Sequence, residues 1–281
     1  MKNHKIKYSI ASSVSEFVKD LRDAVCNPGY WIYSAILDTS VQFRNNRLGF
    51  LWILLSSVVF VLVLGQLYPQ LLGVSVLEYS IHLYLGLTLW NFISHSITQS
   101  ASLSIAHKSF LSSTVAVSLV DMVFRTVMKN LIICWHNLIP FFVFGLFVMP
   151  ESVCFTSFMT AVIGMVFVVI FVISLGLVCC LCTAVLADLS EILNAVFRIG
   201  FLATPIIWMQ DKISVIDSSR EGLRFYIDFN PFYHLIELVR APFLGDNIFN
   251  HIAVIFILIF LSLLIASFSY SPLKRRIEGT F

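Results

Sequence analysis

The chain alternates between long apolar runs and shorter polar segments, and this pattern predicts membrane-spanning helices. A helix needs about 20 mostly apolar residues to cross a hydrocarbon core that is about 30 Å thick. Six runs reach or approach that length, so we expect an all-α polytopic membrane protein with six transmembrane helices. The expected spans cover residues of about 49–68, 80–101, 129–149, 154–186, 191–209 and 249–270.

Polar segments at the two ends divide the chain into three parts. Residues 1–48 form an N-terminal region, residues 49–270 the transmembrane domain, and residues 271–281 a short basic tail. The N-terminal region has an apolar stripe at helical spacing, with charges of both signs elsewhere, which predicts an amphipathic helix in the membrane interface. The stripe consists of Val14, Phe17, Val18, Leu21 and Val25.

The segment before the last span contains helices that are too short to cross. In residues 230–245, Asn230 suits an N-cap, Pro231 the first helical position and Gly245 the C-terminal end. Roughly twelve helical residues reach only about 18 Å. A second short helix fits residues 218–229. We therefore expect two re-entrant helices, within residues of about 216–245, on the external side.

Basic residues set the orientation. Most of the 18 lysines and arginines lie before the first span, between the second and third spans, or in the C-terminal tail. Because cytoplasmic loops carry the excess of Lys and Arg, we expect both termini in the cytoplasm. The opposite side carries Lys212, Arg220, Arg224 and Arg240.

The composition supports a membrane location and excludes several functions. Of 281 residues, 58% are hydrophobic and 12% are charged, and the mean hydropathy is +0.90, whereas a soluble domain carries about 25% charged residues. No G-x-x-x-x-G-K-[ST] phosphate loop occurs, so active transport would need another subunit to bind ATP. We expect no cofactor, metal, catalytic residue or nucleic acid on this chain. Its six cysteines suggest no disulfide framework.

Three motifs resemble the permease subunit of type-2 ATP-binding-cassette exporters, in the branch that exports polysaccharides such as O antigen, capsule and teichoic acid. They are "LDTSVQFRNNRLGFLWILL" (37–55), "ADLSEILNAVFRIGFLATPIIW" (187–208) and "NPFYHLIELVRAPFLG" (230–245). The second motif departs from the family pattern, because Ala187 stands where an Arg usually precedes Asp188.

The resemblance implies a function and its partners. A homodimer of this chain would work with two copies of a separate ATPase subunit, which binds ATP and Mg²⁺. The complex would move a lipid-linked polysaccharide to the external face of the bacterial inner (plasma) membrane, in contact with membrane lipids. This chain would form the channel and would not itself be an enzyme.

The cytoplasmic loop of about residues 102–128 is where the resemblance implies coupling to the ATPase. The candidate contacts are His107, Lys108, Phe110 and Leu111, although a plain connector is the alternative. Asp121, Arg125 and Lys129 recur every four residues, which predicts a ladder of salt bridges along one helix.

Arginine and aromatic residues supply candidate substrate contacts. Arg44 and Arg47 suit a phosphate headgroup arriving from the cytoplasm, or they serve only as topology anchors. The second span is unusually polar, since it contains His82, Asn91, His95 and Gln99. A hydrated conduit or hydrogen bonds between helices would explain these residues. Aromatic residues that suit a glycan path, or simple helix packing, are Trp52, Tyr84, Trp90, Phe201 and Trp208.

The resemblance also implies that residues 230–245 form part of an external gate. Asn230 and Pro231 would begin its second helix, and Glu237 and Arg240 would pair there. Two other functions remain open: a same-type exporter of a drug, lipid or peptide, and a membrane-embedded glycan-modifying enzyme. None of the seven histidines forms a recognisable catalytic motif with Asp or Glu.

Overall fold

The computed structural model describes residues 10–44, 49, 51–110, 117–148, 154–209 and 225–278. Regular secondary structure within these residues is all helical, which confirms the predicted all-α class. The helices are α1 (Ile10–Cys26), α2 (Gly29–Arg44), α3 (Leu51–Leu72), α4 (Val76–Phe110), α5 (Leu119–Val148), α6 (Phe155–Thr183), α7 (Leu189–Ala203), α9 (Pro231–Leu244) and α10 (Phe249–Glu278).

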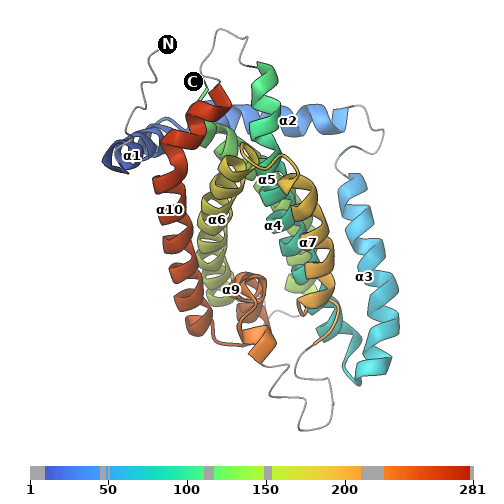
Figure 1. The fold of residues 1–281 in the computed structure, drawn as a ribbon. Coiled ribbons are helices and arrows are strands. Elements are labelled where there is room, and N and C mark those ends of the chain that lie inside the picture. Colours follow the sequence, from blue (N-terminus) through green and yellow to red (C-terminus); the bar gives the residue numbers. More distant parts are fainter. Residues whose placement is uncertain are drawn as a thin grey trace, which may run out of the picture.

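The long helices form a bundle whose centre is α4 and α6 (Figure 1). α6 packs against α4, α9 and α10, and α5 covers another side of α4. α3 lies at the edge of the bundle. In the most apolar window of α6, 56% of the residues are buried, against 17% in α3. α3 therefore presents most of its apolar surface to the surroundings of the isolated chain.

Four helices are long and apolar enough to cross a membrane, in the part of the chain that the structure describes. They cover Leu51–Leu72, Leu119–Gly145, Phe155–Thr183 and Phe249–Lys274. They match the first, third, fourth and sixth expected spans. The count of six stays a prediction, because α4 is long but polar and α7 has only 15 residues.

The polarity of α4 has a structural reason. Some of its polar groups find partners on neighbouring helices: Asn130 Nδ2 of α5 donates to Gln99 Oε1 at 3.3 Å, and the hydroxyls of Ser104 and Thr183 lie 2.6 Å apart. A helix enclosed by other helices does not need an apolar surface on all sides, so hydropathy underestimates its ability to cross a membrane.

The first helix packs against the C-terminal turns of the last helix. Ser13 Oγ of α1 donates to the Ser267 carbonyl oxygen at 2.9 Å. Lys274 Nζ lies 3.0 Å from Glu16 Oε1 and 2.7 Å from Asp20 Oδ2. The expected apolar stripe is thus divided: Phe17 packs on Tyr270 with ring centroids 5.4 Å apart, while Val18 and Val25 remain exposed.

α2 is joined to the start of α5 by a two-pronged ion pair. Arg125 Nε and Nη2 donate to the two carboxylate oxygens of Asp38, each at 2.6 Å. The predicted ladder within α5 is therefore wrong for Arg125, because a carboxylate on another helix offers both oxygens to the planar guanidinium. Asp38 belongs to the first of the three family motifs.

Candidate functional site

α9 forms as its sequence predicts. Asn230 caps it, since its side-chain oxygen accepts from the Phe232 backbone N–H at 3.0 Å, and Pro231 occupies the first turn. Gly245 ends it with φ of 85°, a conformation that favours glycine. Pro242 does not end the helix, which continues to Leu244. Asn230 Nδ2 also donates to Thr204 Oγ1 at 3.0 Å, which fixes the start of α9 to the chain just after α7.

A buried ion pair lies at the middle of α9. Arg240 Nη2 donates to Glu237 Oε1, and the exposed fractions of the two residues are 1% and 7%. Arg240 Nη1 also donates to the Pro205 carbonyl oxygen at 3.0 Å and lies 3.1 Å from His82 Nε2. Because a guanidinium has no acceptor, His82 must accept through Nε2. Arg240 therefore links α9, α4 and the segment after α7.

Glycines allow α9 to approach its neighbours closely. A Cβ atom at Gly164 of α6 would lie 2.1 Å from the Leu238 carbonyl oxygen, so the α9 backbone rests directly on that glycine. A Cβ at Gly86 of α4 would lie 3.2 Å from Arg240 Nη1. At Gly164 the α9 backbone leaves no room for a Cβ, whereas at Gly86 the Arg240 side chain would have to shift slightly to admit one.

A histidine pair joins α9 to α10. The Nδ1 atoms of His234 and His251 are 2.8 Å apart, and His234 Nε2 lies 2.8 Å from the Asp228 carbonyl oxygen. Asp228 ends a single helical turn over residues 225–228. The rest of the first expected short helix lies outside the described residues, so the re-entrant pair stays a prediction.

A cleft of about 380 Å³ opens between α4 and α7, with Phe60 of α3 at its edge. We call it the α4–α7 cleft. Its aromatic wall is Trp90, whose ring contacts Phe197 and Phe201 with centroids 5.8 and 6.1 Å apart. A Cβ at Gly200 would lie 3.0 Å from the Trp90 ring, so α7 passes close to it. The polar residues that line the cleft are Asn91, Ser94, His95 and Thr98 of α4, and Asn194 and Arg198 of α7.

The structure brings together only some of the aromatic residues that were expected along a channel. Trp90 and Phe201 share the α4–α7 cleft. Trp52 is 55% exposed at the start of α3, and Trp208 donates its Nε1–H to the Leu202 carbonyl oxygen at 3.0 Å. Neither lines this cleft. Asn194 and Arg198 were not expected there. Their signal in the sequence is two polar residues, four positions apart, in the otherwise apolar stretch 192–203.

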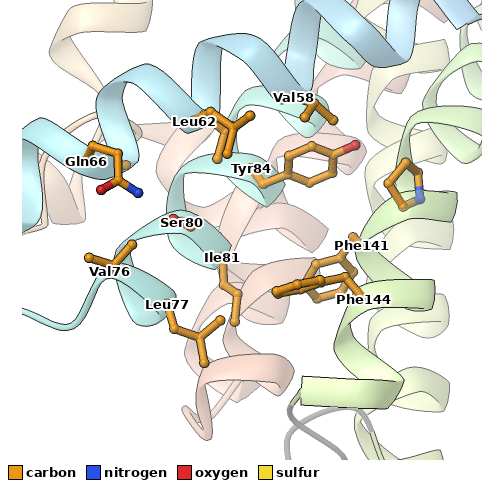
Figure 2. A pocket seen from close by; sticks show the side chains of 13 residues that line it. Val58, Leu62, Gln66, Val76, Leu77, Ser80, Ile81, Tyr84, Phe141 and Phe144 are labelled. Carbon is orange, nitrogen blue, oxygen red and sulfur yellow. The ribbon is translucent and has the colours of Figure 1, made fainter.

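Tyr84 lies in a different pocket, of about 550 Å³, between α3, α4 and α5 (Figure 2). Its hydroxyl donates to the Asn137 carbonyl oxygen at 2.6 Å, so it holds α4 against α5. The walls are mostly apolar, with Leu62, Ile81 and Phe144 among the side chains shown. This pocket suits hydrocarbon better than sugar.

Only part of the remaining candidate site residues is described. Arg44 is the last residue of α2 and is exposed, whereas Arg47 lies outside the described residues. α4 continues through positions 107 and 108 to Phe110, but the side chains there, and all of Leu111, lie outside the description. The expected coupling contacts therefore stay predictions.

The fold and the cleft define a class: a polytopic helical membrane protein with a polar recess between helices, as transporters have.

No family model matches the chain. Two curated proteins, both named O-antigen export system permease protein RfbA and both from Klebsiella pneumoniae, are similar to it. One is 22% identical over 241 residues, which cover 85% of this chain and 90% of the relative. The other is 22% identical over 221 residues, which cover 78% of this chain and 82% of the relative. These comparisons confirm the predicted resemblance to polysaccharide-export permeases.

Proposed function

We propose that this chain is the transmembrane permease of an ATP-driven exporter that moves a lipid-linked polysaccharide from the cytoplasmic to the external face of the bacterial inner membrane. The α4–α7 cleft is the observation that carries the proposal. Polar side chains are costly at membrane depth and usually face a cavity or a path for cargo. Trp90 adds a flat apolar ring beside them, against which a sugar ring can stack.

The arrangement of α7 supports a homodimer. α7 is poorly enclosed: only Phe197 is buried among its residues. One face exposes Asn194 and Arg198, and another exposes Ile192, Val196 and Ile199. A second copy would cover the apolar face and leave the polar face on a shared path. In this proposal α3, α4, α5, α6, α7 and α10 are the six spans, with both termini in the cytoplasm.

The other parts of the chain have separate roles in this proposal. Two copies of a separate ATPase bind ATP and Mg²⁺ and contact the end of α4 and the residue that follows it, through His107, Lys108, Phe110 and Leu111. Arg44 and Arg47 attract the anionic headgroup on the cytoplasmic side. α9 forms the external gate, where Glu237 and Arg240 hold it closed and Asn230 and Pro231 fix its first turn. This chain carries no ATPase site of its own.

Complementation tests the proposal. The gene is deleted in its host and surface polysaccharide is measured by immunoblot of intact cells, with and without the wild-type chain. In parallel, ATP hydrolysis is measured for the purified chain, the purified ATPase and their complex. We expect loss of surface polysaccharide on deletion, its return on complementation, and strong hydrolysis only with the ATPase present. Unchanged surface polysaccharide after deletion would contradict the proposal.

The apolar pocket beside Tyr84 favours a second candidate, an exporter of the same type whose cargo is a lipid or a hydrophobic drug. Its walls would hold a hydrocarbon chain without any sugar. The two candidates differ in what the deletion strain loses. Surface polysaccharide is lost in the first case, whereas in the second the strain accumulates the lipid or becomes sensitive to the drug while its surface polysaccharide is normal.

A further inference from the structure

Arg198 occupies an unusual place for a charged residue. It is the tenth residue of α7, about 14 Å from the start of that helix. The preceding residue, Phe197, is buried against Trp90 near the middle of α4. An arginine at the centre of a membrane helix is disfavoured by about 3 kcal/mol on insertion scales, and such residues usually line a cavity. Arg198 is exposed and lines the α4–α7 cleft.

Among the residues that the structure describes, no acidic partner accounts for Arg198. Among the described residues, the ion pairs of arginine are Arg125 with Asp38 and Arg240 with Glu237, and Arg198 takes part in neither. Glu191, on the same side of α7, lies seven residues away, which is about 10 Å along the helix axis. The described residues that line the cleft include no carboxylate.

Glu191 of a second copy would not supply the partner either. In a two-fold dimer whose axis is normal to the membrane, equivalent residues lie at equal depth. The Glu191 of the other copy would therefore stay about 10 Å from Arg198 in depth. Two copies of Arg198 would face the same path, and that concentrates positive charge there.

The other polar side chains that line the cleft are hydroxyls, amides and an imidazole, and only the amides and the imidazole have N–H groups to donate. Thr98 and Ser94 use their hydroxyls on backbone carbonyls one turn earlier, at 2.8 and 3.4 Å. Asn91, His95 and Asn194 are the other polar side chains that line the cleft. An amide offers two N–H groups and an imidazole offers one or two. One cation surrounded by such donors suits an anion with several oxygens.

We propose that Arg198, with Asn194 and His95, forms an anion site part-way across the membrane that binds a phosphate group of the cargo while the adjoining sugar lies against Trp90. The site deepens the proposed function and rests on it for the identity of the cargo, a lipid-linked phosphate or diphosphate. Arginine suits this role because its planar fork gives two parallel hydrogen bonds to phosphate.

Binding to the full complex of chain and ATPase, in lipid nanodiscs, tests the site. The probes are geranylgeranyl diphosphate, the uncharged alcohol geranylgeraniol, and inorganic diphosphate. The variants are Arg198→Gln, which removes the charge, and Arg198→Lys, which keeps it. Arg22→Gln is the matched control, because Arg22 is an exposed arginine of α1 outside the cleft. Size-exclusion chromatography checks that each variant assembles.

We expect Arg198→Gln to lower the affinity for the prenyl diphosphate by about tenfold or more. A loss of this size corresponds to one hydrogen bond to a charged group. Binding of the alcohol should not change, Arg198→Lys should recover part of the loss, and Arg22→Gln should resemble the wild type. Equal binding of the prenyl diphosphate by wild type and Arg198→Gln would overturn the site. Inorganic diphosphate that binds as tightly as the prenyl form would overturn its assignment to a lipid headgroup.

The outcome separates this site from the proposed function. If deletion of the gene leaves surface polysaccharide unchanged, the function is wrong whatever the binding assay gives. If complementation succeeds and Arg198→Gln both binds the prenyl diphosphate and restores export as the wild type does, the function stands and the anion site is wrong.

Discussion

Arg240 and Glu237 form an ion pair one turn apart on α9, and both side chains are buried inside the bundle. The same guanidinium donates to the Pro205 carbonyl oxygen and faces His82 of α4. Removing one member of a buried pair leaves an uncompensated charge, which is worse than removing both. The contacts of Arg240 with Pro205 and His82 therefore fix where α9 sits, whereas the ion pair lies within α9 and keeps this guanidinium in place. A movement of α9 away from α4 must break both of these contacts.

Glu237→Gln should destabilise the protein strongly. It leaves Arg240 buried with only neutral partners, and breaking a buried pair costs about 3–5 kcal/mol. Thermal unfolding of the purified chain in detergent measures the loss, and surface polysaccharide in cells reports the effect on export. Asp38→Asn is the control, because the Asp38–Arg125 pair is about one-third exposed on each side and such a pair contributes at most about 1 kcal/mol.

The double variant Glu237→Gln with Arg240→Gln should be more stable than Glu237→Gln alone, since it contains no buried charge. The swapped pair, Glu237→Arg with Arg240→Glu, should recover less of the lost stability than this double variant does. A carboxylate at position 240 would face the Pro205 carbonyl oxygen, which is an acceptor and repels it. A swapped pair as stable as the wild type would contradict this role of Pro205.

Gly164→Ala should separate α9 from α6. The new Cβ would meet the Leu238 carbonyl oxygen, a backbone atom that no rotamer change can move away. Overpacking of this kind costs about 1–3 kcal/mol, and we expect the upper part of that range in thermal unfolding. Gly29→Ala is the matched control, because its Cβ would have no atom within 4 Å. Equal unfolding temperatures for the two variants would show that the close contact does not stabilise the fold.

The native cysteines provide a test of topology and pH dependence together. Hydrogen bonds from Ser157 and Thr156 lower the pKa of Cys154, at the start of α6, to about 7. The thiolate is the reactive form, so labelling by a membrane-impermeant maleimide should rise with pH and reach half its maximum near pH 7. The predicted topology places Cys154 outside and Cys26 in the cytoplasm. Intact cells should therefore label Cys154, and Cys26 only after permeabilisation.

Two variants control the cysteine experiment. Cys154→Ser should abolish labelling of intact cells, and Ser157→Ala with Thr156→Val should move the half-maximum toward the ordinary thiol value of about 8.5. Labelling of Cys26 in intact cells would reverse the predicted orientation.

Phe110→Asp or Leu111→Asp should weaken binding of the ATPase if the end of α4 and the loop after it insert apolar side chains into the ATPase, because an aspartate would be buried in an apolar socket. Co-purification of the ATPase with a tagged chain measures this. Ser112→Asp adds the same charge at a polar position of the same loop and should have little effect. If all three variants retain the ATPase equally, the coupling contact lies elsewhere.

Local signals in the sequence were sufficient for α9 but not for the longer helices. Asn230, Pro231 and Gly245 act on their own neighbours, so the expected helix at 230–245 matches α9 within one residue at each end. The second span was expected at 80–101, whereas α4 runs from Val76 to Phe110. Hydropathy detects the apolar part of a helix and not the backbone that continues beyond the membrane.

Contacts between helices were the part that the sequence did not determine. Arg125 pairs with Asp38, 87 positions away, rather than with its neighbours in α5. Trp90 and Phe201 were both expected to line a path and do share a cleft, but Tyr84, chosen on the same reasoning, lies in another pocket. Which aromatic faces which recess depends on how helices are placed side by side, and residue type and spacing carry no information on that.

The contact of α1 with the end of α10 constrains the order in which the protein can be made. Ser13, Glu16 and Asp20 take their partners from residues 267–274 of α10, which the ribosome adds only after α2 to α9 have been made. A chain that emerges N-terminus first must keep α1 undocked, resting on the membrane or held by a chaperone, until these residues have been added. Docking of α1 is then a step of biogenesis that must follow the synthesis and insertion of α10.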